Sequence, residues 1–300
     1  MASQRITRKD IVVGIGDQSS SIGAAGFAVE EAALHGAQVV LVRAVPLPPS
    51  SVANFGAQAL AELESAAHAV VDGVVAQLSV PPGVHLRTRV ECTTPYELLL
   101  GLADDASMIV LGQDRLPMAD RLLAGSVASP LTAVAGCPIV IVPAGYPATR
   151  PDQPAVTVAV DGETSAEQAL RLAFDEAELR GTPLVVLHAV PMDTLPTERQ
   201  DVAASIGELV AGWKADHPDI AVHEVLTTGD PEDVISEQSR NAGLMIVGRP
   251  HAKHVGGWSR SIAHAVLKRT ACPLVVVPRS ARSAEEPRLS RAVHAGTPRT

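Results

Sequence analysis

Short, Val-rich apolar runs alternate along this chain with longer segments whose apolar residues recur every three or four positions. The runs of strand length are Ile11–Ile15, Val39–Val45, Val84–Val90, Met108–Leu111, Ile139–Val142, Val156–Val160, Leu184–Val190, Ile220–Val225, Leu244–Val247 and Leu274–Val277. The helical spacing is clearest in Ser20–His35, Gln58–Leu78 and Pro95–Asp105. Because strands that are almost continuously apolar are typical of sheets covered on both faces, the pattern predicts βαβ units and an open parallel sheet.

The second half of the chain repeats the first. At an offset of 145 residues, five positions match five others: Ala28, Glu31, Ala32, Leu34 and Gly36 with Ala173, Glu176, Ala177, Leu179 and Gly181. The offset falls to 136 for Ile109–Gly112 and Met245–Gly248, and to 135 for Cys137-Pro138 and Cys272-Pro273. Ordered matches separated by small deletions indicate a duplicated domain. We therefore expect an α/β protein with two tandem, doubly wound, five-stranded parallel-sheet domains.

Proline marks the boundary between the two copies. Four prolines fall within Pro143–Pro154, which cannot continue a strand or helix and is interpreted as an extended linker. We place the first domain at residues 1–145 and the second at residues 155–280. The remaining polar segment, residues 281–300, lacks apolar periodicity and is expected to be a disordered tail.

Composition and charge exclude several classes of protein. With 46% apolar residues and 19% charged residues, the chain is not disordered as a whole. A net charge of −9 and only 2% aromatic residues argue against a protein that grips nucleic acid. Three scattered cysteines and the absence of an apolar amino-terminal signal favour the cytoplasm. The uncharged stretch Leu122–Thr149 is broken by glycine and proline, so a buried α/β segment is preferred to a membrane span.

Glycines follow the fourth strand of the first copy, where open α/β sheets bind ligands. Gly112 ends that strand, and Gly125-Ser126 begins the next helical segment. A helix N-terminus offers free N–H groups and a partial positive charge, so this loop is a candidate phosphate cradle. It is not a Walker A loop, because no Gly-Lys-Ser/Thr follows.

These features resemble the universal stress protein family in its tandem, two-domain form. The resemblance rests on the duplicated layout, Gly112, Gly125-Ser126 and the closing Cys137-Pro-Ile-Val-Ile-Val, and it covers Ile11 to Pro278. It implies an adenine nucleotide alpha hydrolase-like fold. Members of this family that bind ATP carry G-x2-G-x9-G-[S/T], together with an acidic residue that closes the first strand and faces the adenosine.

Both copies depart from that signature. In the first, Arg115 replaces the second glycine and Gly16 stands where the acidic residue is expected. In the second, Asp161 holds the acidic position, but the phosphate loop is one residue short. The resemblance implies that eight residues take part in ATP binding. They are Gly112, Arg115, Gly125 and Ser126 in the first copy and Asp161, Gly248, Arg260 and Ser261 in the second, where Arg260 replaces a glycine. Family members also associate through their last strands, which implies that Ile139–Val142 pairs with Leu274–Val277 within the chain, with a homodimer as a further possibility.

Other interpretations are weaker. Gly14-Ile-Gly16 lacks the third glycine of a dinucleotide fingerprint, so a nicotinamide reductase is disfavoured. His251, His254 and His264 have no cysteine to complete a zinc set, and a polar loop is preferred. Cys137 and Cys272 are expected to be small buried hydrophobes, whereas Cys92 could be reactive or inert.

No residues point to a catalytic mechanism. No Ser-His-Asp or G-x-S-x-G arrangement appears at a strand–helix turn. The carboxylates of Gln58–Leu78 and Ser165–Leu179 are interpreted as solvated helix faces. We therefore expect no metal site and a non-enzymatic, adenine-nucleotide-binding protein of the stress response, with at most incidental ATP hydrolysis. The alternative is a nucleotide-free protein that keeps the fold and acts through protein–protein contacts.

Overall fold

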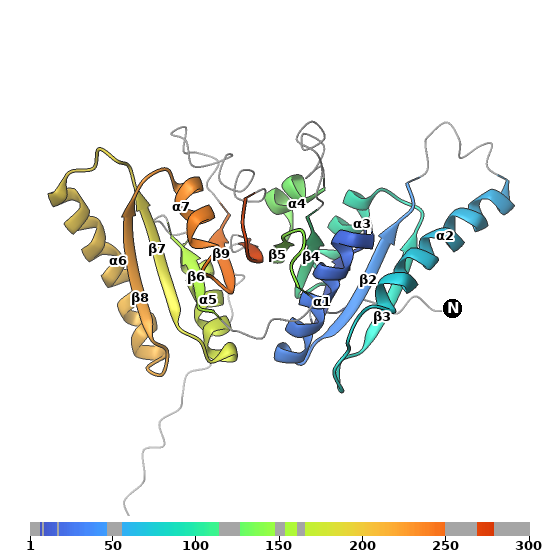
Figure 1. The fold of residues 1–300 in the computed structure, drawn as a ribbon, viewed down its shortest axis with the longest axis horizontal. Helices are drawn as coiled ribbons and strands as arrows, with labels where there is room; N and C mark the ends of the chain where they lie inside the picture. The colour runs from blue at the N-terminus through green and yellow to red at the C-terminus, as the bar shows by residue number, and fades with distance from the viewer. Residues whose placement is uncertain are drawn as a thin grey trace, which may run out of the picture.

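In the part of the chain that the structure describes, ten strands form one sheet that helices cover on both faces (Figure 1). The computed structural model describes residues 7, 9–16, 18–46, 56–113, 127–147, 154–160, 166–249 and 269–278. The first five strands are β1 (Asp10–Gly14), β2 (Gln38–Ala44), β3 (Leu86–Glu91), β4 (Met108–Gly112) and β5 (Ile139–Val142). The second five are β6 (Val156–Ala159), β7 (Leu184–Val190), β8 (Val222–Thr228), β9 (Leu244–Gly248) and β10 (Leu274–Val277).

Both halves have the same strand order. The sheet runs β3-β2-β1-β4-β5-β10-β9-β6-β7-β8, and all pairs within each half are parallel. This is the doubly wound arrangement, in which strand order reverses beside β1 in one half and beside β6 in the other. The expected fold class, two tandem doubly wound five-stranded parallel units, is therefore confirmed.

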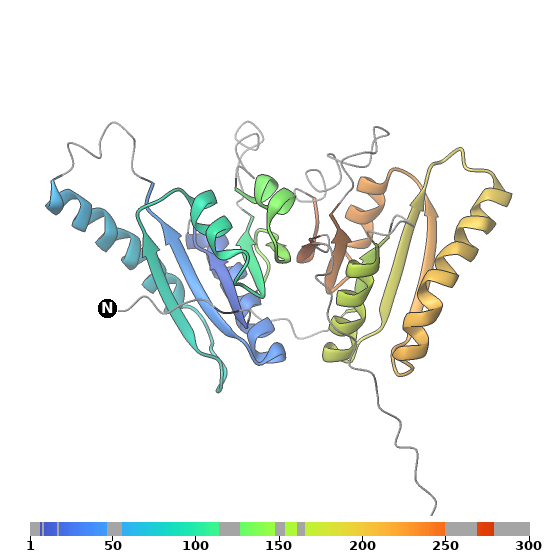
Figure 2. The same cartoon turned by 180° about the vertical axis from the view of Figure 1, so that it is seen from behind.

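Helices cover the two faces in different sets. Contacts of α1 (Gln18–His35), α2 (Ala57–Val75), α5 (Ala166–Arg180) and α6 (Pro196–Asp216) build one apolar core. Contacts of α3 (Pro95–Leu102), α4 (Ala128–Val134) and α7 (Pro231–Gln238) build the other. The two views from opposite sides show the halves related by a rotation about the vertical axis (Figures 1 and 2).

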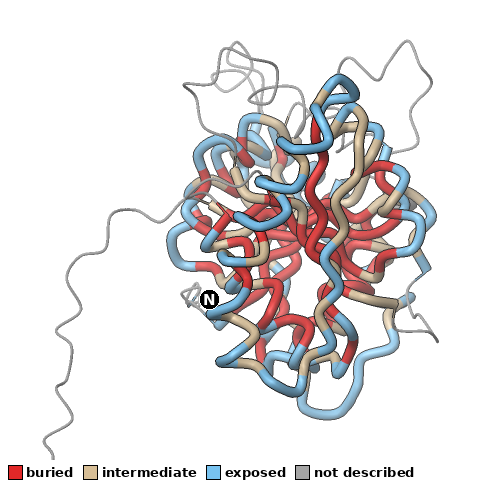
Figure 3. Tube along the Cα trace, turned by 90° about the vertical axis from the view of Figure 1, so that its left-hand side faces the viewer, coloured by how far each residue is buried: buried red, intermediate tan, exposed pale blue. Residues whose placement is uncertain are grey.

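Alternation along each strand divides the apolar residues between these cores. In β1, Val13 packs toward α1 and α2, whereas Val12 packs toward α3 and α4. Successive side chains of a strand point to opposite faces, so a strand covered on both sides must be apolar throughout. The burial-coloured trace shows the resulting buried strands inside a more exposed outer shell (Figure 3).

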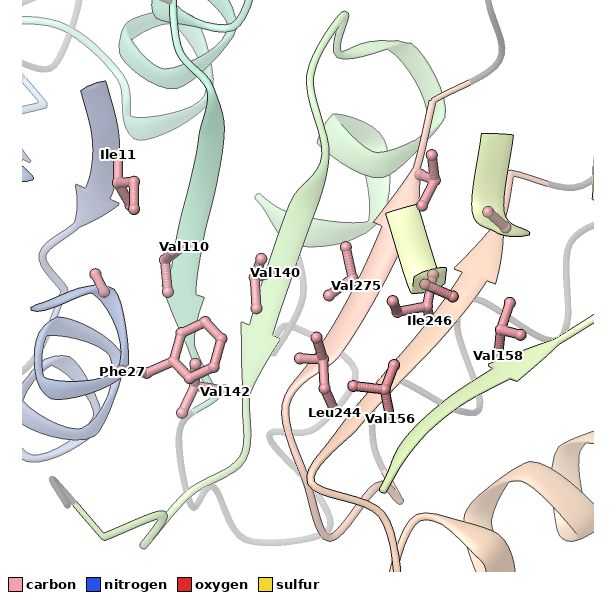
Figure 4. Packing of buried hydrophobic residues seen from close by; sticks show 14 of the residues in the cluster. Ile11, Phe27, Val110, Val140, Val142, Val156, Val158, Leu244, Ile246 and Val275 are labelled. Atoms are coloured by element: carbon pink, nitrogen blue, oxygen red, sulfur yellow. The ribbon is translucent and has the colours of Figure 1, made fainter. Parts of the chain in front are cut away.

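The two halves meet where β5 and β10 run antiparallel at the centre of the sheet. Val140 lies opposite Val275, with Ile141 opposite Leu274 on one side of that pair. At the repeat offset of 135, Val140 is the equivalent of Val275, so a pseudo-two-fold axis passes through this pair. Figure 4 shows the side chains of Val140 and Val275 on neighbouring strands at this junction. The apolar core on this face is continuous across the junction.

Four charged side chains join α1 to α5 near the same axis. We call Glu31, His35, Glu176 and Arg180 the seam quartet. His35 Nε2 lies 3.0 Å from Glu176 Oε1 and 3.5 Å from Glu31 Oε2, while Arg180 donates to both carboxylates. The carboxyl-terminal ends of the two helices approach each other at the lower centre of Figure 1. At the offset of 145, His35 corresponds to Arg180, so one i,i+4 pair occurs twice about the pseudo-axis.

Predicted and observed elements agree closely where glycine or proline borders them. β5, β7 and β10 have the predicted bounds, while β8 is shifted from Ile220–Val225 to Val222–Thr228. The interpretation of every carboxylate in Ser165–Leu179 as solvated is wrong for Glu176, whose side chain is 3% exposed. Among the helices in the described ranges, none combines the length and apolar character needed to cross a bilayer.

Candidate functional site

In the first half, the carboxyl ends of β1 and β4 form the edge at which a ligand is expected. Past β1, the N–H of Gly16 donates to Ser21 Oγ at 3.1 Å, which draws the start of α1 toward the strand end. Arg43, one residue from the end of β2, donates through Nη1 to the carbonyl oxygens of Ile15 and Gly16. A guanidinium group therefore lies at this edge, beside the position where the family carries an acid.

Gly112 is required at the end of β4 by packing. A Cβ added there would lie 2.2 Å from the carbonyl oxygen of Ser20 in the first turn of α1, a contact that no side chain can make. The glycine thus allows α1 to lie directly against the strand, close to the expected phosphate position. Its presence is explained by this close approach, whatever the ligand.

The second half builds the corresponding edge differently. At the position equivalent to Arg43, His188 is buried and its Nδ1 lies 2.7 Å from the carbonyl oxygen of Val160, just past β6. In both halves, therefore, a side chain from the second strand binds a carbonyl at the end of the first. The first half carries a fixed positive charge at this place, and the second carries an imidazole.

Arg249 follows Gly248 at the end of β9 and connects to the other half. Its N–H donates to Val277 O at 3.0 Å, and its Nη2 donates to Ala135 O at 2.5 Å, at the carboxyl end of α4. The first residue after the second copy's glycine is thus bound to the first copy. Of the predicted site residues, Gly112 and Gly248 are placed by the structure. Six lie outside the described residues: Arg115, Gly125, Ser126, Asp161, Arg260 and Ser261.

The cysteines occupy contrasting environments. Cys137 and Cys272 are buried, as predicted, and burial raises the pKa of Cys137 to about 12. Cys92 is exposed, and its Sγ donates to Glu64 Oε1 at 3.3 Å. Partial desolvation and the Glu64 carboxylate raise the pKa of Cys92, which favours the protonated thiol and disfavours nucleophilic chemistry.

The seam quartet was not foreseen as a unit. The sequence gives Glu31 and Glu176 as matched positions of the repeat and places Glu176 on a helix face interpreted as solvated, and nothing in the pattern of either helix indicates that the two would meet. Hydrogen bonding to Glu176 and Glu31 raises the pKa of His35 to about 10. Burial opposes ionisation of Glu176, but His35 and Arg180 hold the pKa of Glu176 below its usual range. Two anions and two cations therefore face one another between the halves.

Comparison with known proteins identifies close relatives in sequence and fold. The model of the universal stress protein family matches residues 7–143 and 155–278. A universal stress protein of Mycolicibacterium smegmatis is 29% identical over 292 residues, covering 91% of this chain and 98% of the relative. One from Mycobacterium tuberculosis is 31% identical over 294 residues, covering 89% and 95%.

A solved structure shows the same architecture over most of the chain. A universal stress protein from Archaeoglobus fulgidus covers 91% of this chain and 97% of its own, with 17% identity and a TM-score of 0.66. A shorter one from Archaeoglobus fulgidus, in complex with dAMP, covers 42% of this chain and 98% of its own, with 25% identity and a TM-score of 0.35.

Proposed function

The chain belongs to the universal stress protein family, and from that premise we propose that it binds an adenine nucleotide, ATP foremost, at the carboxyl edges of its parallel strands. Gly112, Gly125 and Ser126 are assigned to the phosphates in the first half. In the second half Asp161 is assigned to the adenosine, and Gly248 and Ser261 to the phosphates. Arg115 and Arg260, which replace glycines, are assigned to phosphate charge.

The observation that carries this proposal is the doubly wound order of both halves. Crossovers run in opposite directions on either side of β1 and β6, and sheets of this kind bind ligands at such points, here the carboxyl ends of β1 and β4 and those of β6 and β9. Gly112 and Gly248 end β4 and β9 at these two places. Arg43 adds a positive charge at the first of them, which suits a phosphorylated ligand.

We infer that the protein is a binding module of the cytoplasmic stress response, without a catalytic role of its own. Nucleotide occupancy would then alter its contacts with other proteins. The two halves would act as one unit in solution, held by the β5–β10 pair and the seam quartet, and two such chains could associate further.

Equilibrium dialysis of the full chain with ATP, ADP and cyclic AMP tests the proposal. We expect saturable binding, weakened about ten- to a hundredfold by Asp161→Ala, as for the loss of one charged hydrogen bond. Gly125→Ala should also weaken nucleotide binding, because the added Cβ would keep the backbone from approaching the phosphates closely. Gly101→Ala and Asp201→Ala are the matched controls, because both residues are exposed on helices, Gly101 on α3 and Asp201 on α6.

The repeat also supplies a gain-of-function variant. Gly16 is exposed, and a Cβ added there meets no atom within 4 Å, so Gly16→Asp introduces the acid of the second half without a clash. We expect Gly16→Asp to strengthen adenosine binding by the first half. Absence of saturable binding in the wild type and in Gly16→Asp would favour the nucleotide-free interaction protein.

A further inference from the structure

The seam quartet contains a Glu–His–Glu set whose ligand atoms converge. One ligand atom from each of Glu31, His35 and Glu176 lies within 4.8 Å of the other two. Carboxylate oxygen and imidazole nitrogen are zinc ligands. We propose that these three side chains form a site for a divalent transition-metal ion, with Zn²⁺ as the best-matched ion, at the junction of the two halves.

Arg180 arranges the carboxylates for this role. Its Nη2 donates to Glu31 Oε1 and its Nη1 to Glu176 Oε2, so each carboxylate gives its outer oxygen to the guanidinium. The inner oxygen of each carboxylate is the one that faces His35. Hydrogen bonds that hold the outer atoms of metal ligands are a general feature of metal sites, because they fix ligand orientation.

The separations suit a tetrahedral ion. Zinc bonds of about 2.0–2.2 Å place neighbouring ligand atoms roughly 3.3–3.5 Å apart. His35 Nε2 lies 3.0 Å from one carboxylate oxygen and 3.5 Å from the other, so both separations are close to those of a tetrahedral zinc site. Three protein ligands leave a fourth position for water, the ligand count that catalytic zinc sites also have.

A cavity provides access and room for that water. Its volume is about 800 Å³, and it is lined by all three ligands together with apolar residues of both halves, including Phe27, Val140 and Val275. It lies between α1 and α5 over the central strands, and Figure 4 shows the side chains of its apolar floor. The imidazole of His35 is 26% exposed, so the proposed site is not sealed from solvent.

Charge balance allows the ion despite Arg180. On metal binding the N–H proton of His35 leaves to solvent, and the nitrogen lone pair forms the bond to the metal. Two carboxylates, one guanidinium and a divalent ion then carry one net positive charge. Asp175, which lines the same cavity, brings a further acidic group to offset it, whereas Glu178 there pairs with His217 at 3.1 Å. The ion therefore replaces a proton in a site already shaped by two anions.

The repeat supports the assignment and provides the test. The second half carries arginine where the first carries His35, and arginine cannot ligate a metal. His35→Arg therefore keeps a cation between the carboxylates and preserves the quartet as ion pairs, while removing the nitrogen ligand. His68→Arg makes the same substitution at an exposed position of α2 and is the matched control.

Equilibrium dialysis of the full chain against Zn²⁺, without nucleotide, gives the number of ions bound. We expect the wild type and His68→Arg to bind one more ion per chain than His35→Arg. The wild type and His35→Arg have every other histidine in common, so a difference between them reports on His35. Equal stoichiometry in all three proteins would overturn the site and leave the quartet as ion pairs only.

Crystals of the wild type soaked in Zn²⁺ give a measurement independent of the variant's folding. Anomalous scattering at the zinc edge should place an ion between Glu31, His35 and Glu176, and its absence from that position would also overturn the proposal. Neither experiment involves nucleotide, so either outcome is separate from the fate of the proposed nucleotide sites.

Discussion

Replacing Arg180 with methionine should strongly destabilise the protein, because two buried carboxylates then lose their guanidinium partner. The side chains of Glu31 and Glu176 are 4% and 3% exposed, and that of Arg180 is 11% exposed. Arg180 makes one charge-assisted hydrogen bond to each carboxylate, each worth about 1.5–3 kcal/mol. Losing both costs roughly 3–6 kcal/mol, in line with the about 3–5 kcal/mol typical of a broken buried ion pair.

Urea unfolding followed by far-ultraviolet circular dichroism, with a chelator present, measures this loss by linear extrapolation of the free energy of unfolding. Arg240→Met is the matched control: its side chain and that of its partner Glu237 are 61% and 72% exposed, so the change should stay within about 0.5 kcal/mol. The double variant Glu31→Gln, Arg180→Met should lose less free energy of unfolding than the two single variants together, because Arg180→Met already removes the arginine partner of Glu31. A loss for Arg180→Met no larger than that for Arg240→Met would refute the reasoning.

Two further predictions concern packing and thiol chemistry. Gly112→Ala should lower the free energy of unfolding by at least about 1–3 kcal/mol in the same assay, because its Cβ would clash with the Ser20 carbonyl oxygen. Gly101→Ala should instead stabilise α3 by up to about 1 kcal/mol. Equal effects of the two changes would contradict the packing argument. In the folded protein at mildly alkaline pH, mass spectrometry should find Cys92 alkylated and Cys137 unmodified until unfolding, because Cys92 is exposed, whereas Cys137 is buried and its pKa is raised to about 12. Similar rates would show that Cys137 is accessible.

Much of the fold is readable from the chain because parallel strands buried on both faces must be apolar without interruption. β5 and β10 were predicted at their observed bounds, since each follows Cys-Pro and is followed by another proline. β8 was misplaced because it is an edge strand: of Val222–Thr228, none is buried, so the apolar signal weakens and polar residues continue the strand. Exposed edges give less compositional signal than centres.

The candidate nucleotide site was only partly predictable. Gly112 was singled out from its place after a strand, and the structure adds the reason, a close approach to Ser20 that has no local signature. The binding of Arg249 to the Ala135 carbonyl could not be predicted, because 114 residues separate the two partners and neither sequence neighbourhood indicates the other.

The sequence by itself determined the duplication, the strand–helix alternation and the parallel order within each half, because these depend on periodicity and burial within short segments. The resemblance implied that the last strands of the two halves pair, but only the tertiary structure decided the register of that pair and the contacts made beside it. The seam quartet joins residues 141 and 149 positions apart, and each carboxylate taken alone resembles a solvated group on a helix face. The antiparallel register of β5 and β10 brings the ends of α1 and α5 together, and burial there makes the carboxylates of Glu31 and Glu176 depend on His35 and Arg180 as partners.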